Sequence, residues 1–280
     1  MQITPLSPAL GALIEHFDPG DCSESDWECL RKALFETHHL LLLRGLALSD
    51  EEHVEFCSHF GPLGMVGNNN TKRFSYISNV RPDGILGSIE ASWHFDYAFT
   101  ESPLEAISLF GSDVRETGAP TLFANAKRAA AHLPDDLAAR LKGLRLRNAV
   151  DVAAPEKEAG VRVRMKRLDE TYPHHVRELL WPHWKTGDLL LSVNEQQSDA
   201  VIGLPEAEGV ALLEDLFTRL YRPEHIYAHH WQPNDLIIWD NHALHHSRPE
   251  VGESKPRTLR RVSIGKSPDL SIYDRSRTGG

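Results

Sequence analysis

The chain has 280 residues, of which 41% are apolar, so it can bury a sizeable hydrophobic core within one large domain. Its formal net charge of -10 excludes a general nucleic-acid binder, because such proteins present basic surface to phosphate groups. The three cysteines, Cys22, Cys29 and Cys57, lack metal-type C-x-x-C spacing, which excludes a disulfide framework and a structural zinc knuckle and favours a reducing, cytoplasmic location.

The first sixty residues combine helical and strand patterns. A helical apolar spacing around Trp27 predicts a helix, and "LLLLRG" at 40–45 predicts a short buried strand after it. Ser49 and Glu52 have the spacing of a capping box for a second helix. The apolar run within 40–45 is far too short to span a bilayer, and no basic targeting region precedes it, so we expect neither a membrane segment nor a targeting segment.

Strand patterns dominate from Phe74 onward. Short β-rich runs separated by Pro, Gly and Asp predict an all-β core: "RFSYISNV", "SWHFDYAF", "LEAISLFG" and "TLFANA". Residues 125–143 return to a helical pattern, and a helix at 204–221 precedes two last strands, "HIYAHHW" and "DLIIWDN". We expect a single mixed α/β, mainly β domain over 1–280, with a surface insertion or mobile lid at about 144–175.

One of these strands carries two candidate metal ligands. His94 and Asp96 lie two residues apart, so both side chains leave the same face of an extended strand. Imidazole and carboxylate suit Fe(II), and a second histidine would complete a facial triad with open coordination positions. The H-x-D pattern alone is weak, because an ordinary polar pair has the same sequence. Candidates for the second histidine are His242, His245 and His246, since a jelly roll brings a late strand beside an early one.

These motifs together resemble the taurine dioxygenase/TfdA family of Fe(II)- and 2-oxoglutarate-dependent dioxygenases. The resemblance covers most of the chain, through "LLLLRG", "FGPLG", "ISNV", "WHFDYAF", "TLFANA", "WQPNDLIIWDN" and the arginine-rich end. It implies a double-stranded β-helix, the cupin-like jelly roll, with flanking helices. It also implies that the distal metal ligand is His246, five residues after the Asn of "WDN", while His245 points elsewhere.

The resemblance further implies a site for 2-oxoglutarate. The far carboxylate of this cosubstrate would be held by two residues. Arg257 is the arginine eleven residues beyond the distal histidine, and Thr121 is a threonine after the H-x-D strand. A guanidinium binds a carboxylate bidentately, and a hydroxyl adds a directional donor. The alternatives are an ordinary surface arginine and a threonine present for its strand propensity.

Two further residues are expected to contact the substrate. Arg261 lies four residues beyond Arg257 and shares its face on an extended strand, whereas Arg260 faces the other way. The family's matching arginine binds an acidic group, which implies an anionic substrate. Glu90 stands where the taurine enzyme has an amide, and a pocket-facing Glu90 would favour a substrate that also carries an amine. A solvated Glu90 and a structural salt bridge at Arg261 are the alternatives.

The implied reaction uses Fe(II), with 2-oxoglutarate and O2 as cosubstrates, to oxidise an unactivated C–H bond of a small molecule, releasing succinate and CO2. Hydroxylation is the expected outcome, and desaturation, cyclisation or oxidative decarboxylation are alternatives within the same chemistry. Alternatives of another class are a non-catalytic jelly-roll binding protein and a Zn²⁺ hydrolase, since zinc sites also accept histidine and carboxylate. The sequence leaves the oligomeric state open, a homo-oligomer included.

Overall fold

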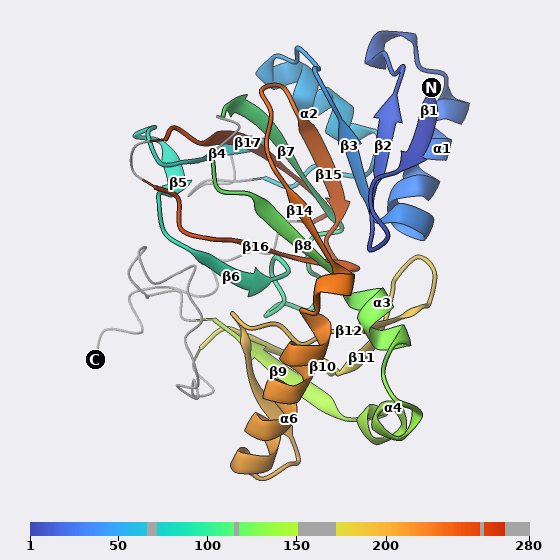
Figure 1. Cartoon of the computed structure of the whole chain (residues 1–280), viewed down its shortest axis with the longest axis vertical. Helices are drawn as coiled ribbons and strands as arrows, with labels where there is room; N and C mark the ends of the chain where they lie inside the picture. Colours follow the sequence, from blue (N-terminus) through green and yellow to red (C-terminus); the bar gives the residue numbers. More distant parts are fainter. Residues whose placement is uncertain (66–71, 115–117, 151–171, 253–254, 267–280) are drawn as a thin grey trace.

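The computed structural model describes residues 1–65, 72–114, 118–150, 172–252 and 255–266. Two sheets form its centre (Figure 1). The large sheet has the strand order β1 (Gln2–Pro5), β2 (Ala12–Glu15), β3 (Leu40–Leu43), β15 (Leu236–Asp240), β7 (Ala106–Asp113), β17 (Thr258–Ile264), β4 (Phe74–Ser78) and β5 (Gly84–Leu86). The small sheet has the order β14 (Ile226–His229), β8 (Thr121–Asn125), β16 (Leu244–Arg248) and β6 (Ala91–His94).

Strands from the two ends of the chain alternate within both sheets. In the large sheet β15 pairs antiparallel with β3 and β7, and β17 pairs with β7 and β4. In the small sheet β16 lies between β8 and β6, and its His246 is directly opposite His94. This is the jelly-roll arrangement that the sequence predicts, and it brings residues about 150 positions apart into contact.

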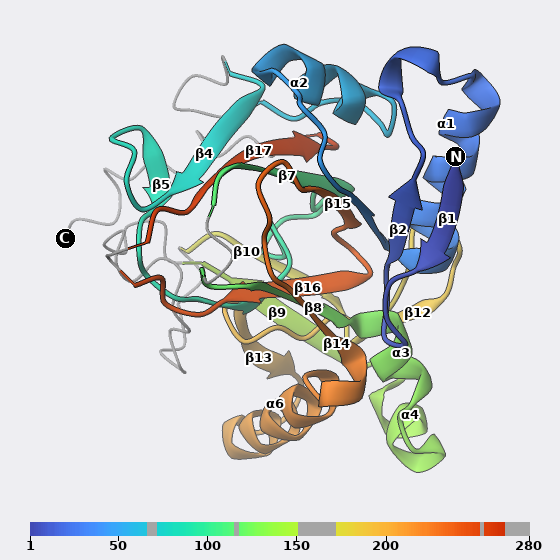
Figure 2. The same ribbon diagram turned by 45° about the horizontal axis from the view of Figure 1, so that its top comes forward.

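Helices and two smaller sheets surround this centre (Figures 1 and 2). The helices are α1 (Glu24–Lys32), continued by a π-helical segment (Ala33–His38), α2 (Asp50–Ser58), α3 (Ala126–Ala131), α4 (Asp135–Leu141) and α6 (Glu206–Leu220), with short 3-10 turns at Pro19–Asp21 and Pro223–His225. The smaller sheets are β10 (His174–Glu178), β9 (Arg145–Ala149) and β13 (Ser198–Ile202), and the hairpin of β11 (Leu180–Pro182) and β12 (Leu189–Leu191). None of the helices in the described part of the chain has the length and apolar character needed to span a bilayer.

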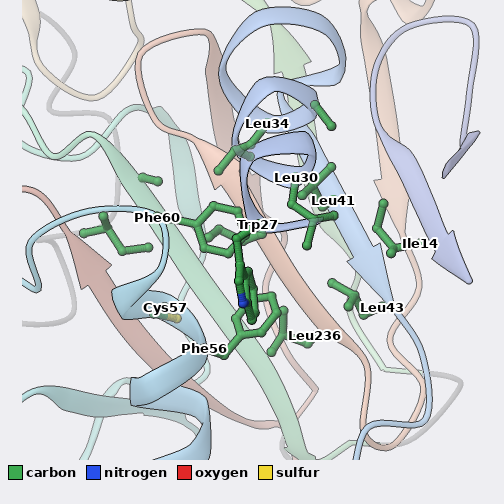
Figure 3. Close-up of a cluster of buried hydrophobic side chains, with 14 of the residues drawn as sticks. Ile14, Trp27, Leu30, Leu34, Leu41, Leu43, Phe56, Cys57, Phe60 and Leu236 are labelled. Atoms are coloured by element: carbon green, nitrogen blue, oxygen red, sulfur yellow. The ribbon is translucent and has the colours of Figure 1, made fainter. Parts of the chain in front are cut away.

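Helices α1 and α2 cover one face of the large sheet. Trp27 of α1 and Phe56 of α2 meet edge to face, with ring centroids 5.6 Å apart, above Leu41 and Leu236 of the sheet (Figure 3). The predicted capping box of α2 is present, with Ser49 and Glu52 bonding each other's backbone N–H. This packing covers one face of the large sheet, and the other face packs toward the small sheet through residues such as Leu42, Trp239 and Phe123.

Two predicted segments differ from the structure. The helical pattern at 125–143 forms two short helices, α3 and α4. Pro134, the N-cap of α4, has no backbone N–H to donate and therefore prevents one continuous helix. The ends of the predicted lid at 144–175 are ordered strands, β9 and β10, which pair antiparallel with each other. Residues 151–171, the middle of that prediction, lie outside the described residues.

Candidate metal and cosubstrate site

Two histidines of the small sheet and an aspartate from the turn after β6 form a candidate metal site. His94, Asp96 and His246 each offer a ligand atom, and these atoms lie within 4.8 Å of one another. Nε2 of His94 is 3.2 Å from Oδ1 of Asp96, and Nε2 of His246 is 3.6 Å from the same oxygen. In the residues that the structure describes, this is the one such group. Two imidazoles and a carboxylate whose ligand atoms converge are the ligand set of the facial triad that the sequence predicts.

His94 and Asp96 do not lie on one continuous strand. Strand β6 ends at His94, and Asp96 lies in the following turn, where Tyr97 has a left-handed backbone with φ of 61°. The side chain of Asn241 fixes this turn, because its Oδ1 accepts from the Asp96 N–H at 2.9 Å and its Nδ2 donates to the Asp96 carbonyl at 3.1 Å. The same Nδ2 also donates to the carbonyl of Leu104 at 2.9 Å. The ligand geometry therefore depends on an amide outside the triad.

The neighbours of the two histidines set their orientation. Nδ1 of His94 donates to the carbonyl of Ser92 at 2.7 Å, which leaves Nε2 as the free lone pair for a metal. The His246 ring packs edge to face against Trp239, with centroids 4.9 Å apart. Burial, and then the nearby His94, lower the pKa of His246 well below its usual value. A neutral imidazole is the form that binds a metal.

Asp96 remains ionised at neutral pH. Burial alone would raise its pKa, but the charge of Arg261 and the adjacent His94 and His246 outweigh burial and hold the pKa well below its usual range. Nη2 of Arg261 lies 2.5 Å from Oδ2 of Asp96, so the two carboxylate oxygens have different neighbours. Oδ1 faces the histidines, and Oδ2 faces the arginine.

His245, the neighbour of the distal ligand, points away from the triad. Its Nδ1 is hydrogen-bonded to the hydroxyl of Tyr221 at 3.1 Å, and its ring is fully buried. Burial, and to a smaller extent His94, lower its pKa to about 3, so it is neutral at physiological pH. Alternation along β16 explains why only one member of the His-His pair reaches the triad.

The triad opens into a cavity of about 280 Å³ between the two sheets. Mostly apolar side chains line it, together with three arginines and two glutamines: Ile77, Ile85, Leu86, Ala91, Tyr97, Phe99, Leu109, Trp239, Leu259, Arg248, Arg257, Arg261, Gln196 and Gln197 among others. An apolar cavity with a few convergent polar groups is the usual form of a small-molecule site.

Arg257 and Thr121 meet at this cavity, as the resemblance implies. Nη2 of Arg257 donates to Oγ1 of Thr121 at 2.9 Å, and its Nε donates to the carbonyl of Ala119. Arg257 is 4% exposed, and its Nη1 has no hydrogen-bond partner among the described residues. Burial, and then the charge of Arg248, lower its pKa to about 9. A buried guanidinium with one free donor fits the far carboxylate of 2-oxoglutarate.

Arg261 and Arg260 leave opposite faces of β17, as strand alternation predicts. Arg261 lines the cavity with Arg257. Arg260 instead turns toward α2, where its Nε donates to Nδ1 of His53 at 3.0 Å and its Nη1 pairs with Asp50.

Glu90 does not lie in the metal cavity, and the prediction that it faces the pocket is wrong. Its side chain is exposed and borders a separate surface depression with Trp93 and Glu214. On a regular strand, a residue four positions before His94 would share its face. The pairing of β6 with β16 is irregular between His94 and Ala91, so Ala91 takes the cavity-facing position instead.

Sequence reasoning missed several residues around the site. Asp240 of the "WDN" motif is fully buried, with its Oδ2 3.2 Å from Nδ1 of His39 and 2.9 Å from Nε2 of His183. Its Oδ1 accepts from the N–H of His242 and Ala243, which fixes the turn between β15 and β16. The "WDN" motif can be recognised in the sequence, but the partners of Asp240, His39 and His183, lie far from it along the chain. Nothing in the sequence around Arg248, apart from its being an arginine, indicates that it lines the cavity.

Comparisons with known proteins agree with this architecture. Residues 2–263 match the model of the family described as taurine catabolism dioxygenase TauD, TfdA family. The alpha-ketoglutarate-dependent 2,4-dichlorophenoxyacetate dioxygenase of Cupriavidus pinatubonensis is 29% identical over 285 residues, which cover 92% of this chain and 96% of that relative. The (S)-phenoxypropionate/alpha-ketoglutarate-dioxygenase of Sphingobium herbicidovorans is 27% identical over 287 residues and covers 95% of each chain.

Solved structures show the same fold. A taurine dioxygenase from Burkholderia xenovorans superposes with a TM-score of 0.78 at 24% identity, covering 94% of this chain and 90% of that chain. The structure of AAD-2 in complex with Mn(II) and N-oxalylglycine has a TM-score of 0.78 at 20% identity, and the match covers 95% of this chain and 98% of that chain. A non-catalytic binding protein and a zinc hydrolase, the alternatives of another class, do not agree with these matches. With its triad, its jelly roll and a family match over residues 2–263, the chain belongs to the TauD/TfdA family of 2-oxoglutarate-dependent dioxygenases.

Proposed function

We propose that the cavity binds Fe(II) on His94, Asp96 and His246, and binds 2-oxoglutarate with its far carboxylate on Arg257 and Thr121. The observation that carries this proposal is the free, buried Nη1 of Arg257 in the same cavity as the triad. Leaving a buried charged donor unpaired is costly, so this position favours an anionic ligand. 2-Oxoglutarate has a carboxylate at each end and joins the two parts of the site.

The residues of this chain contribute positioning and exclusion of water. When bound, Fe(II), 2-oxoglutarate and O2 supply the oxidation of a C–H bond, with succinate and CO2 as products. His94, Asp96 and His246 would hold the ion as a facial triad, a ligand set that would leave coordination positions for the cosubstrates. Phe99, Trp239 and Leu109 form apolar walls that keep water from the reacting atoms. Hydroxylation is the outcome we propose.

We infer that the substrate is a small anion with an apolar body. Arg261 lines the cavity in direct contact with Asp96 of the triad, and the remaining walls are mainly apolar. The names of the two curated relatives describe dioxygenases of phenoxyalkanoates, which combine an apolar ring with a carboxylate. Because Glu90 lies outside the cavity, the reason to expect an amine on the substrate is removed.

A succinate-release screen with Fe(II), 2-oxoglutarate and O2 tests this proposal. Aryloxyalkanoates and other apolar carboxylates should stimulate succinate formation, whereas their neutral amides should not. In Arg261→Ala, the preference for the acid over its amide should fall by about tenfold or more, the effect of losing roughly 1.4 kcal/mol of binding free energy. If acid and amide lose activity equally in the variant, Arg261 serves Asp96 alone and the substrate assignment fails.

A further inference from the structure

We propose that Arg248 is a specificity-determining residue for the cosubstrate. Together with Arg257 it makes the far end of the cavity doubly cationic, which selects 2-oxo acids that carry a second carboxylate. This inference rests on the proposed function of the same cavity and adds a residue to it.

The fold places Arg248 on the cavity side of the small sheet. Arg248 lies two residues beyond His246 on β16, and both line the cavity with Arg257, while Arg248 also borders the surface depression beside Glu90. Ser247 is paired with Leu122 of β8, which puts Arg248 level with the neighbouring Thr121. Arg248 therefore lies at the end of the cavity where Thr121 accepts the hydrogen bond from Arg257.

Backbone carbonyls hold the Arg248 side chain in place. Its Nη2 donates to the carbonyls of Leu86 and Gly87, at 3.3 and 3.2 Å, and to that of Ile89. Leu86 and Gly87 both have left-handed backbones, with φ of 64° and 41°, a conformation that turns successive peptide groups toward one side. Arg248 is 5% exposed, and its Nε has no hydrogen-bond partner among the described residues.

Arg248 and Arg257 each carry a positive charge that the carboxylates of the described residues do not neutralise. Neither arginine forms an ion pair with a carboxylate of the described residues. Burial lowers the pKa of Arg248 to about 10, and burial and then the charge of Arg248 lower the pKa of Arg257 to about 9. Two buried cations side by side are unfavourable until an anion joins them. A 2-oxo acid without a distal carboxylate would leave both charges uncompensated, so charge alone distinguishes it from 2-oxoglutarate.

The plainer explanation is that Arg248 only anchors the loop at 86–89. Arg177 shows what such an anchor looks like, because its Nη2 donates to the carbonyls of Ala98 and Thr100 at 2.8 and 2.6 Å. Arg177 is also 5% exposed, and burial lowers its pKa to about 10 as it does for Arg248. Arg177 does not line the cavity, so it is a matched control for the loss of a buried, carbonyl-bound guanidinium.

Calorimetric titration of the Mn(II)-loaded protein separates the two roles. The probes are 2-oxoglutarate and 2-oxovalerate, which have the same number of carbons but two and one carboxylates. Arg248→Met should reduce the preference for 2-oxoglutarate over 2-oxovalerate by about tenfold or more, or roughly 1.4 kcal/mol. Arg248→Lys, which keeps the charge, should lose less of the preference, and Arg177→Met should leave it unchanged. Arg248→Gln, which retains an amide donor for the loop, replaces Arg248→Met if the latter does not fold.

Equal weakening of both probes in the neutral Arg248 variants, or no change, would overturn the inference and leave Arg248 as a loop anchor. A wild-type protein that binds the two probes equally well would instead overturn the proposed function, because Arg257 would then not recognise a distal carboxylate. The two failures are therefore distinguishable in one series of titrations.

Discussion

The side chain of Asn241 fixes the backbone of a metal ligand from outside the triad. Its amide bonds both the N–H and the carbonyl of Asp96, and thereby orients a ligand that lies beyond the end of β6. The sequence shows Asn241 within a recognisable motif but not its partner, because the two residues are 145 positions apart. The identity of the triad was thus predictable from the sequence, whereas the means of holding it was not.

Asn241→Ala should lower Mn(II) affinity by about 10- to 100-fold, as loss of an outer contact to a metal ligand usually does. The matched control is Asn125→Ala, since Asn125 also bonds a backbone N–H and a carbonyl, those of Arg128 and Ala9, away from the triad. Both variants should lose similar stability in thermal unfolding, and only Asn241→Ala should lose metal affinity in calorimetric titration. Equal metal affinity in the two variants would show that Asp96 needs no support from Asn241.

His246→Ala should abolish specific Mn(II) binding, because two ligands remain on a site that needs three. His245→Ala should retain it, since His245 is bonded to Tyr221 and points away. Electron paramagnetic resonance of Mn(II) measures bound and free ion directly. The reverse result would move the distal ligand to His245.

Arg257→Ala should raise the KM for 2-oxoglutarate markedly, because removal of one partner of a buried charge pair costs about 2 to 5 kcal/mol. The KM for the primary substrate should change much less. Steady-state kinetics at saturating concentration of the other substrate give both values. An unchanged KM for 2-oxoglutarate would reject the placement of its carboxylate on Arg257.

At the scale of elements, buried histidines connect helices to the sheets. His53 of α2 accepts from Arg260 of β17 and is hydrogen-bonded to Ser108 of β7 at 2.8 Å. The periodicity of apolar residues largely predicted which segments form helices and which form strands. The capping box of Ser49 and Glu52 also predicted the start of α2. The bulge in β6 was not predictable, because the sequence around Ala91 has the alternation of a regular strand. The irregular pairing puts Ala91, and not Glu90, at the cavity position that the family resemblance implied for Glu90.

The low pKa values of three buried histidines lead us to expect a pH dependence of the free energy of unfolding. Burial lowers the pKa of His53 to about 3, of His245 to about 3 and of His242 to about 4, from 6.5 in the unfolded chain. Below pH 6.5 the unfolded state therefore binds more protons, so stability is complete above that pH and falls toward pH 4. Each such histidine contributes a loss of up to about 1.4 kcal/mol per pH unit.

Urea unfolding between pH 7 and pH 5 measures this effect. His53→Gln should flatten the pH dependence, whereas His230→Gln at an exposed position should not. A free energy of unfolding that stays constant over this range would show that the buried histidines are not kept neutral by the fold.

For the whole molecule, function depends on strands from opposite ends of the chain. β16 brings His246 opposite His94 of β6, Arg257 just before β17 bonds Thr121 of β8, and Arg261 of β17 contacts Asp96 in the turn after β6. The sequence predicted this closure only through the family resemblance, since no local pattern specifies which strands pair. The single-domain organisation over 1–280 and the cytoplasmic location stay predictions.

The most direct test of this account is a crystal structure of the protein with Mn(II) and 2-oxoglutarate, with the metal located by its anomalous scattering. We expect the ion between Nε2 of His94, the Asp96 carboxylate and Nε2 of His246, with the far carboxylate of 2-oxoglutarate on Arg257 and Thr121. An ion bound elsewhere, or a far carboxylate that contacts neither residue, would contradict the account.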